Sequence, residues 1–166
     1  MKISSQRRAA FASLLLAPAL AACGFGAQTD QVYQAATGVN DRSGDIDVLN
    51  ALIVSGEDGS GTLAVTLVNN SQTQKDALTG VTGEGVTVDA KKVTVPVDGL
   101  VNLAESGDVS VDGDGVAAGK FVTLTLTFEN GQATTVTVPV VTDEGDYADV
   151  PLPKAKPSDD ASPAAE

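Results

Sequence analysis

The chain has 166 residues, with 10 basic and 22 acidic side chains, so its formal net charge at pH 7 is −12. Such a polyanion is repelled by DNA, RNA and anionic lipid headgroups, so we expect no nucleic acid among its partners. The sequence contains no histidine, one cysteine and one methionine, which is the initiator. These counts exclude His-dependent nucleophilic catalysis and deprive Zn, Cu and Ni sites of their usual ligands, so no cofactor is expected.

Residues 1–22 have the composition of a bacterial export signal. Lys2, Arg7 and Arg8 supply a positive start, and residues 9–20 form an apolar run. That run is too short to span a membrane and has the length of a signal-peptide core. Its removal takes three basic residues away, so the exported chain has a net charge of −15.

Leu20, Ala21, Ala22 and Cys23 together form a lipobox, the pattern that lipoprotein-processing enzymes read. We therefore expect a thioether between Cys23 and diacylglycerol, with cleavage between Ala22 and Cys23. Two acyl chains suffice for stable anchoring, which predicts a location at the outer face of the cytoplasmic membrane. With Cys23 lipidated, no disulfide is possible. The alternative is an ordinary secretory signal with an unrelated cysteine.

The composition divides the remainder of the chain into three parts. Residues 23–44 are small and polar, which predicts a flexible tether. Residues 45–142 have the composition of one folded domain. Residues 143–166 are rich in Pro, Asp and Ala, which predicts a disordered tail with Tyr147 and Val150 as its candidate contacts to the domain.

The domain consists of segments in which apolar and polar residues alternate, which indicates β-strands. In the first segment Ile46, Val48, Leu52 and Val54 share one parity. The expected strands cover residues 45–54, 63–68, 86–88, 93–97, 109–111, 122–128 and 136–140. Residues 75–79 allow at most one helical turn. About seven short strands without a helix predict an all-β sandwich or a small barrel.

Turn residues support this interpretation. Asn130-Gly131 separates two strongly alternating segments and favours a type I′ hairpin turn. Pro96 and Pro139 have no N–H to donate, so we expect them on edge strands or facing away from a neighbouring strand.

Several stretches together resemble the PCuAC family of exported copper chaperones. They are residues 48–51, 63–70, 78–82 leading to 86–88, 119–128 and 136–140. This resemblance implies a cupredoxin-like, immunoglobulin-like β-sandwich. With the lipobox, the chain is most similar to the actinobacterial lipoprotein branch of that family.

The resemblance also implies where copper ligands would stand, since the family binds copper through two His and two Met. Asp89 occupies the place of the first His, and residues 90–98 contain no Met. The His-x-Met pair corresponds to Val109 and Val111. A soft ion needs imidazole or thioether ligands, so the resemblance implies a copper-chaperone scaffold without its copper site.

One other loop has metal-like chemistry. Asp108, Asp112 and Asp114 alternate with Gly113 and Gly115, and such oxygen donors suit Ca²⁺. No Glu stands where an EF-hand loop has its bidentate closing ligand, so a solvated turn between strands is the favoured interpretation.

These observations predict a lipid-anchored, extracytoplasmic domain that is not an enzyme. Its expected contacts are the membrane, through Cys23, and an unknown extracytoplasmic protein, with no small-molecule substrate. The alternative is a metal-handling accessory lipoprotein related to copper delivery, which binds a harder ion through Asp89 or the 108–114 loop. A hydrolase is a third class, which no set of residues supports.

Overall fold

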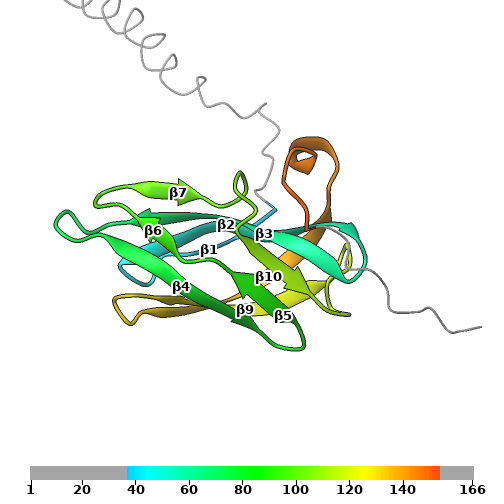
Figure 1. The fold of residues 1–166 in the computed structure, drawn as a ribbon, viewed down its shortest axis with the longest axis horizontal. Helices are drawn as coiled ribbons and strands as arrows, with labels where there is room; N and C mark the ends of the chain where they lie inside the picture. Colours follow the sequence, from blue (N-terminus) through cyan, green and yellow to red (C-terminus); the bar gives the residue numbers. More distant parts are fainter. Residues whose placement is uncertain (1–36, 154–166) are drawn as a thin grey trace, which may run out of the picture. The chain divides into compact units, whose positions relative to one another are not determined.

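The computed structural model describes residues 37–153, and almost all regular structure in this range is β-strand (Figure 1). The strands are β1 (Val39–Asp41), β2 (Ile46–Glu57), β3 (Ser60–Asn69), β4 (Asp76–Gly83), β5 (Thr87–Ala90), β6 (Val93–Val95), β7 (Leu100–Asn102), β8 (Val109–Asp112), β9 (Phe121–Phe128) and β10 (Ala133–Thr142). The short 3₁₀ turn η1 (Gly145–Tyr147) follows them. The all-β class is confirmed. The three strands beyond the expected seven are β1, β4 and β7, and β4 includes most of the segment for which one helical turn was considered.

The strands form two layers that share β10. We call β1, β2, β3, β5, β7 and β8 sheet A, and β4, β6, β9 and β10 sheet B. Residues 133–139 of β10 pair antiparallel with β9, whereas residues 140–142 pair parallel with β2. Pro139 lies where β10 leaves β9 and passes to sheet A. Up to Pro139, β10 pairs with β9 alone among the described strands, and a strand segment with one neighbour tolerates a residue without an N–H.

Alternating side chains of both sheets fill the space between them. Val122, Leu124, Leu126 and Phe128 point inward from β9, as their parity predicts. Leu63, Val65 and Leu67 of β3 face them in the same cluster and are at most 2% exposed. Because this core is made of aliphatic side chains and one phenylalanine, its stability depends on close packing and not on aromatic contacts.

The expectation that Ile46, Val48, Leu52 and Val54 share one face is wrong. Asn50 adopts a left-handed backbone conformation with φ of 51°, and the register of β2 against β3 shifts between Leu49 and Leu52. Such a β-bulge reverses the parity of every residue that follows it. Ile46 and Val48 therefore lie in the main core, whereas Leu52 and Val54 lie on the outer face of sheet A.

The expected type I′ turn at Asn130-Gly131 is also wrong. Gly131 has a positive φ of 91°, but Asn130 does not. The Gly131 N–H donates to the Phe128 carbonyl at 3.1 Å, and the Phe128 N–H donates to the Gln132 carbonyl at 2.9 Å. This is the three-residue hairpin loop in which a type I turn is followed by one left-handed glycine.

Both expected domain boundaries need correction within the described residues. Strand β1 lies inside the segment expected to be tether and pairs with β2, and the Asn40 side-chain oxygen accepts the Asn50 N–H at 2.7 Å. After β10, residues 143–153 cross the outer face of sheet A, and we call them the C-terminal strap. Tyr147, Val150 and Leu152 of the strap pack against Leu52, Val54 and Ala64. The folded unit therefore begins before residue 45 and continues past residue 142.

The Gln132 side chain joins the β9–β10 hairpin to the start of β2. Its amide oxygen accepts the Ile46 N–H at 3.0 Å, and its amide nitrogen donates to the Ile46 carbonyl at 3.0 Å. The same nitrogen donates to the Thr134 hydroxyl at 3.0 Å. The side chain thus pairs with Ile46 as a neighbouring strand would, at a residue that is fully buried.

We expect Gln132→Ala to lower the free energy of unfolding by about 2–4 kcal/mol, because two buried backbone groups of Ile46 lose their partners. Urea unfolding measures this change. Asn130→Ala is the matched control in the same hairpin, since in the described residues the Asn130 side chain accepts only the exposed Gln132 N–H, at 2.8 Å. A loss for Gln132→Ala no greater than that of the control would show that water replaces the amide.

Candidate functional site

The positions at which the resemblance places copper ligands do not converge in the structure. Strands β5 and β8 pair so that Asp89 lies opposite Ser110, while Val111 lies opposite Val88 and Val109 opposite Ala90. Val109 and Val111 are fully buried in the main core, and Asp89 is exposed on the other face of the same sheet. Three residues on opposite faces of one sheet cannot bind a single ion.

The Asp108–Asp114 loop is shaped by backbone packing. The Gly113 N–H donates to the Gly59 carbonyl at 2.9 Å, and the Gly59 N–H donates to the Val116 carbonyl at 2.6 Å. A Cβ on Gly113 would lie 2.9 Å from the Gly85 carbonyl, so this close approach requires glycine. The loop is thus hydrogen-bonded to the tip of the β2–β3 hairpin and packs closely against the turn between β4 and β5.

The acidic side chains of this loop have separate surroundings. The Ser106 hydroxyl and the Lys91 ammonium lower the pKa of Asp108, and Lys91 Nζ lies 3.0 Å from Asp108 Oδ1. Asp112 and Asp114 are exposed. Within residues 37–153, no three His, Cys, Asp or Glu side chains lie close enough to hold one metal ion. This geometry favours the solvated turn over the Ca²⁺ site.

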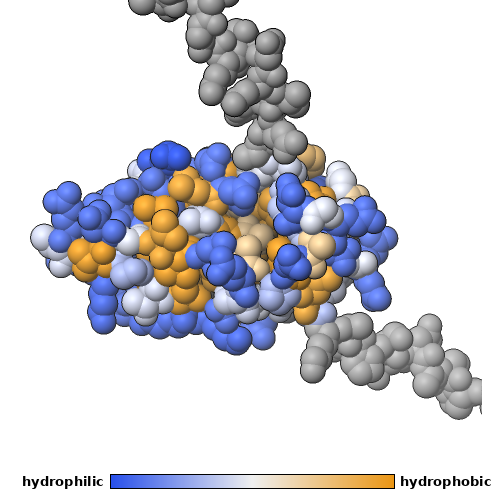
Figure 2. All heavy atoms as spheres, turned by 90° about the horizontal axis from the view of Figure 1, so that it is seen from above, coloured by the Kyte–Doolittle hydropathy of each residue, from blue (hydrophilic) through white to orange (hydrophobic). Residues whose placement is uncertain are grey.

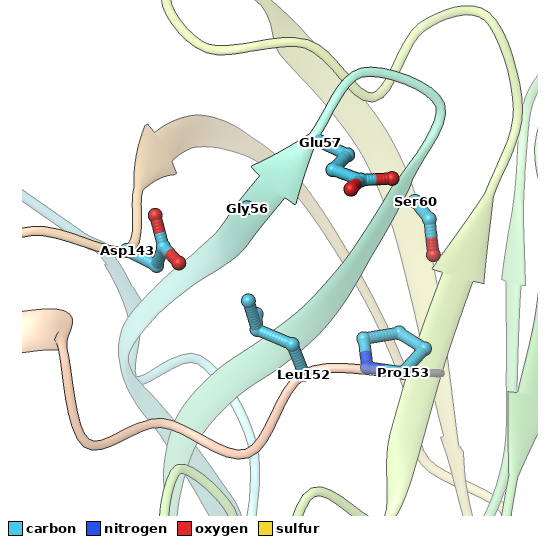
Figure 3. A pocket seen from close by; sticks show the side chains of 6 residues that line it. All are labelled: Gly56, Glu57, Ser60, Asp143, Leu152 and Pro153. Carbon is cyan, nitrogen blue, oxygen red and sulfur yellow. The ribbon is translucent and has the colours of Figure 1, made fainter. Parts of the chain in front are cut away.

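The C-terminal strap leaves a hollow beside it (Figure 3). This cavity of about 230 Å³ is lined by Gly56, Glu57, Ser60, Asp143, Leu152 and Pro153. A side chain at position 56 would collide with the strap, since a Cβ on Gly56 would lie 2.6 Å from Leu152 Cδ1. In the described residues the Ser60 hydroxyl is hydrogen-bonded to neither carboxylate, so it lacks the partner that activates a serine nucleophile.

A second cavity, of about 340 Å³, lies under η1 on the same face of sheet A. It is lined by Asn50, Ala64, Val65, Thr66, Asn102, Ala104, Asp146, Tyr147 and Val150. Both cavities lie beside the strap, where it crosses the outer face of sheet A. A hydrogen bond also holds the strap to the sheet, since the Thr62 hydroxyl donates to the Pro151 carbonyl at 2.6 Å.

Sheet B presents a different outer face. Outward-pointing threonines are frequent on β4, β9 and β10, and we call six of them the threonine face: Thr82, Thr123, Thr125, Thr127, Thr135 and Thr137. The hydroxyls of Thr123 and Thr137 lie 3.0 Å apart, and those of Thr125 and Thr135 lie 2.9 Å apart. The alternation of Thr with apolar residues in the sequence predicts this hydroxylated face. The register between the strands, which aligns the threonines in rows, is visible only in the structure.

Large apolar side chains reach the surface at few points. Val97, Leu100 and Phe121 are 41%, 62% and 67% exposed. Figure 2 shows hydrophobic patches on one face of the molecule that are separated by hydrophilic side chains. The surface seen there is therefore not one continuous apolar interface.

The predicted lipidation site lies outside the described residues. Leu20, Ala21, Ala22 and Cys23 all precede residue 37, so lipidation at Cys23 stays a prediction. Among residues 37–153, the structure contains no helix with the length and hydropathy of a membrane span.

Three solved structures are similar to this chain in fold. The apo PCuAC domain from PmoF1 superimposes with a TM-score of 0.53 at 18% sequence identity, covering 63% of this chain and 99% of that domain. The copper-bound PCuAC domain from PmoF2 has a TM-score of 0.51 at 20% identity, covering 63% of this chain and 98% of that domain. The apo PmoF2 domain gives 0.51 at 18% identity, covering 64% and 98%.

No family model and no curated protein sequence matches the chain. At these identities the structural likeness establishes the fold alone. The described part of the chain has the cupredoxin-like β-sandwich fold of PCuAC domains, and the expected fold class is confirmed.

Proposed function

We propose that this chain is a lipid-anchored, extracytoplasmic β-domain that binds a protein partner and catalyses no reaction. Its scaffold is that of a copper-chaperone domain of the actinobacterial lipoprotein branch, without the Cu(I) site. The lipobox supports the anchor and the location, and the PCuAC-like fold supports the scaffold.

The observation that carries the proposal is the placement of Val109 and Val111. Both stand where the resemblance puts a His and a Met, and both are fully buried core residues with no lone pair to offer a metal. The sequence supplies no replacement, because it has no histidine and its single methionine is the initiator. Once Cys23 is lipidated, the exported chain has no soft ligand for Cu(I).

We expect the Cys23→Ser chain to take up no Cu(I) in competition with a colorimetric copper chelator, and its melting temperature to be unchanged by the ion. The serine variant removes the one thiol that would bind copper without regard to the fold. The copper-bound PCuAC domain from PmoF2 serves as the positive control. Stoichiometric uptake by the Cys23→Ser chain would contradict the loss of the site.

A metal-handling accessory is the second candidate, because a domain of the same fold has been solved with copper bound. Here the ion would be a harder one, bound by Asp89 or by the acidic side chains of the 108–114 loop. The same Cys23→Ser chain, titrated with Ca²⁺, separates the two candidates. A rise in melting temperature that disappears in Asp112→Asn/Asp114→Asn would favour metal handling through the loop.

A further inference from the structure

The threonine face is an ordered array of hydroxyls. Across the three strands, Thr82 pairs with Thr125, and Thr125 pairs with Thr135. Thr123 and Thr137 form the next row, with Phe121 and Pro139 beyond them. Neighbouring strands lie about 4.8 Å apart, and successive outward residues on one strand about 6.8 Å apart. The hydroxyls thus form a grid held rigid by the sheet.

The hydroxyls retain hydrogen-bonding capacity toward solvent. Each has one donor and two acceptor sites, and the Thr125–Thr135 and Thr123–Thr137 pairs use one bond each. A hollow of about 300 Å³ lies over this grid, lined by Thr82, Gly83, Glu84, Thr123, Thr125 and Thr135. That volume is at the lower end of the range for small-ligand sites.

The face is uncharged in a strongly acidic protein. Strands β4, β9 and β10 contain one ionisable residue, Asp76, which is 7% exposed and accepts the Ala77 N–H at 2.7 Å. Glu84, Lys120 and Glu129 stand next to the ends of these strands and thus at the rim. A ligand on the face therefore meets the neutral hydroxyls of the threonines, with the exposed Glu84 carboxylate as the one charged group that lines the hollow.

An aromatic ring adjoins the grid. Phe121 shares the outward parity of Thr123 and Thr125, and it is 67% exposed opposite Pro139. An exposed aromatic ring beside hydroxyl donors and acceptors suits a molecule with one apolar C–H face and many hydroxyls.

The size of the face disfavours a protein as its occupant. Three strands about 4.8 Å apart, over the length from Phe121 to Thr127, offer roughly 300 Å². A stable protein–protein interface needs about 800 Å² from each partner, and its strongest contacts seldom come from threonine. A second copy of this acidic chain would gain too little contact here to be held.

We propose that the threonine face and Phe121 bind sugar rings of a neutral glycan. The hollow over Thr82, Thr125 and Thr135 accepts a ring edge through hydroxyl–hydroxyl hydrogen bonds, while Phe121 stacks on the C–H face of a neighbouring ring. This binding site goes beyond the proposed protein-binding function and does not depend on lipid anchoring. Because the site offers one aromatic ring and a few hydroxyls, we expect it to bind a pentasaccharide with a dissociation constant of about 1 mM.

The test is a titration of the ¹⁵N-labelled Cys23→Ser chain with maltopentaose, cellopentaose, mannopentaose and chitopentaose, followed by NMR. We expect at least one of these to shift the amide resonances of β4, β9 and β10 selectively. Thr82→Val/Thr125→Val/Thr135→Val keeps the side-chain shapes and removes three hydroxyls, so binding weakens by about tenfold or more. Phe121→Ala, at an exposed position, weakens binding about threefold to tenfold. Thr66→Val on sheet A leaves binding unchanged.

The proposal is overturned if none of the four sugars shifts these resonances at about ten times the expected dissociation constant. Equal binding by the triple variant or by Phe121→Ala overturns it as well. Analytical sedimentation of the unliganded chain tests the alternative that the face binds a second copy of the protein. Self-association that Thr125→Lys abolishes would show that the face binds a second copy and not a glycan.

Discussion

Cys23→Ala is expected to abolish both the lipid modification and the cleavage that follows it. The lipobox enzymes act on the cysteine sulfur, so alanine leaves no atom to which diacylglycerol can be attached. We expect the N-terminal peptide of the wild-type protein, isolated from membranes, to begin at Cys23 and to have the mass of a lipidated cysteine. The variant should show an uncleaved leader with no lipid mass.

The effect is large because the anchor consists of acyl chains. Each buried CH₂ contributes about 0.8 kcal/mol to membrane binding, and two chains convert marginal, reversible binding into stable attachment. Thr66→Val, far along the chain from the lipobox, serves as the control and should be lipidated normally. A wild-type N-terminal peptide without lipid, cleaved at another bond, would show that the leader is an ordinary secretory signal.

Leu52→Ala is expected to lower the free energy of unfolding by about 2–5 kcal/mol, although Leu52 lies on the outer face of sheet A. Leu52 is fully buried there because the C-terminal strap covers it, so the truncation leaves a cavity between strap and sheet. For a domain of this size the melting temperature should fall by about 10 °C or more. Leu100→Ala is the matched control, since Leu100 is 62% exposed and should cost little.

A double-mutant cycle tests whether the strap is the cause. Leu152 of the strap belongs to the same cluster as Leu52, so the effects of Leu52→Ala and Leu152→Ala should overlap. We expect the double variant to be less destabilised than the two single variants predict together, by about 0.5 kcal/mol or more. Additive effects, or a small cost for Leu52→Ala alone, would contradict the packing of the strap on sheet A.

The strands that the sequence predicted well are those in which alternation is uninterrupted. In β9 every second residue from Val122 to Phe128 is apolar and buried, because a strand with one buried face has a two-residue period. In β3 the inward residues Leu63, Val65 and Leu67 alternate in the same way, although Thr62 and Ala64 on the other face are buried as well. Strand β4 was missed because two of its eight residues are glycines and its apolar residues, Ala77, Leu78 and Val81, do not alternate strictly. Strand β1 has only three residues, too few for an alternating pattern, and pairs with the next strand, β2.

From the sequence, the chemistry of the candidate site could be predicted only where the type of residue alone determines whether a metal can bind. The absence of histidine and the valines at positions 109 and 111 follow from the sequence. That Asp89 lies on the opposite face of the sheet follows from the pairing of β5 with β8. One strand of the threonine face could be predicted, because the two-residue period of a strand places Thr123, Thr125 and Thr127 on the same side. Their alignment with the threonines of β4 and β10 depends on the register between the strands, which the sequence does not show.

By itself, the sequence determined the all-β class, the acidity, the lack of soft metal ligands and the lipobox, because each depends on local composition or spacing. Only the tertiary structure decided which face Leu52 and Val54 occupy. One left-handed residue, Asn50, reverses the parity of the strand, and the neighbouring residues do not reveal such a bulge. The tertiary structure likewise decided that the strap is folded. A segment of low hydrophobicity becomes ordered when a surface is present to bury Tyr147, Val150 and Leu152, and the bulge in β2 creates that surface.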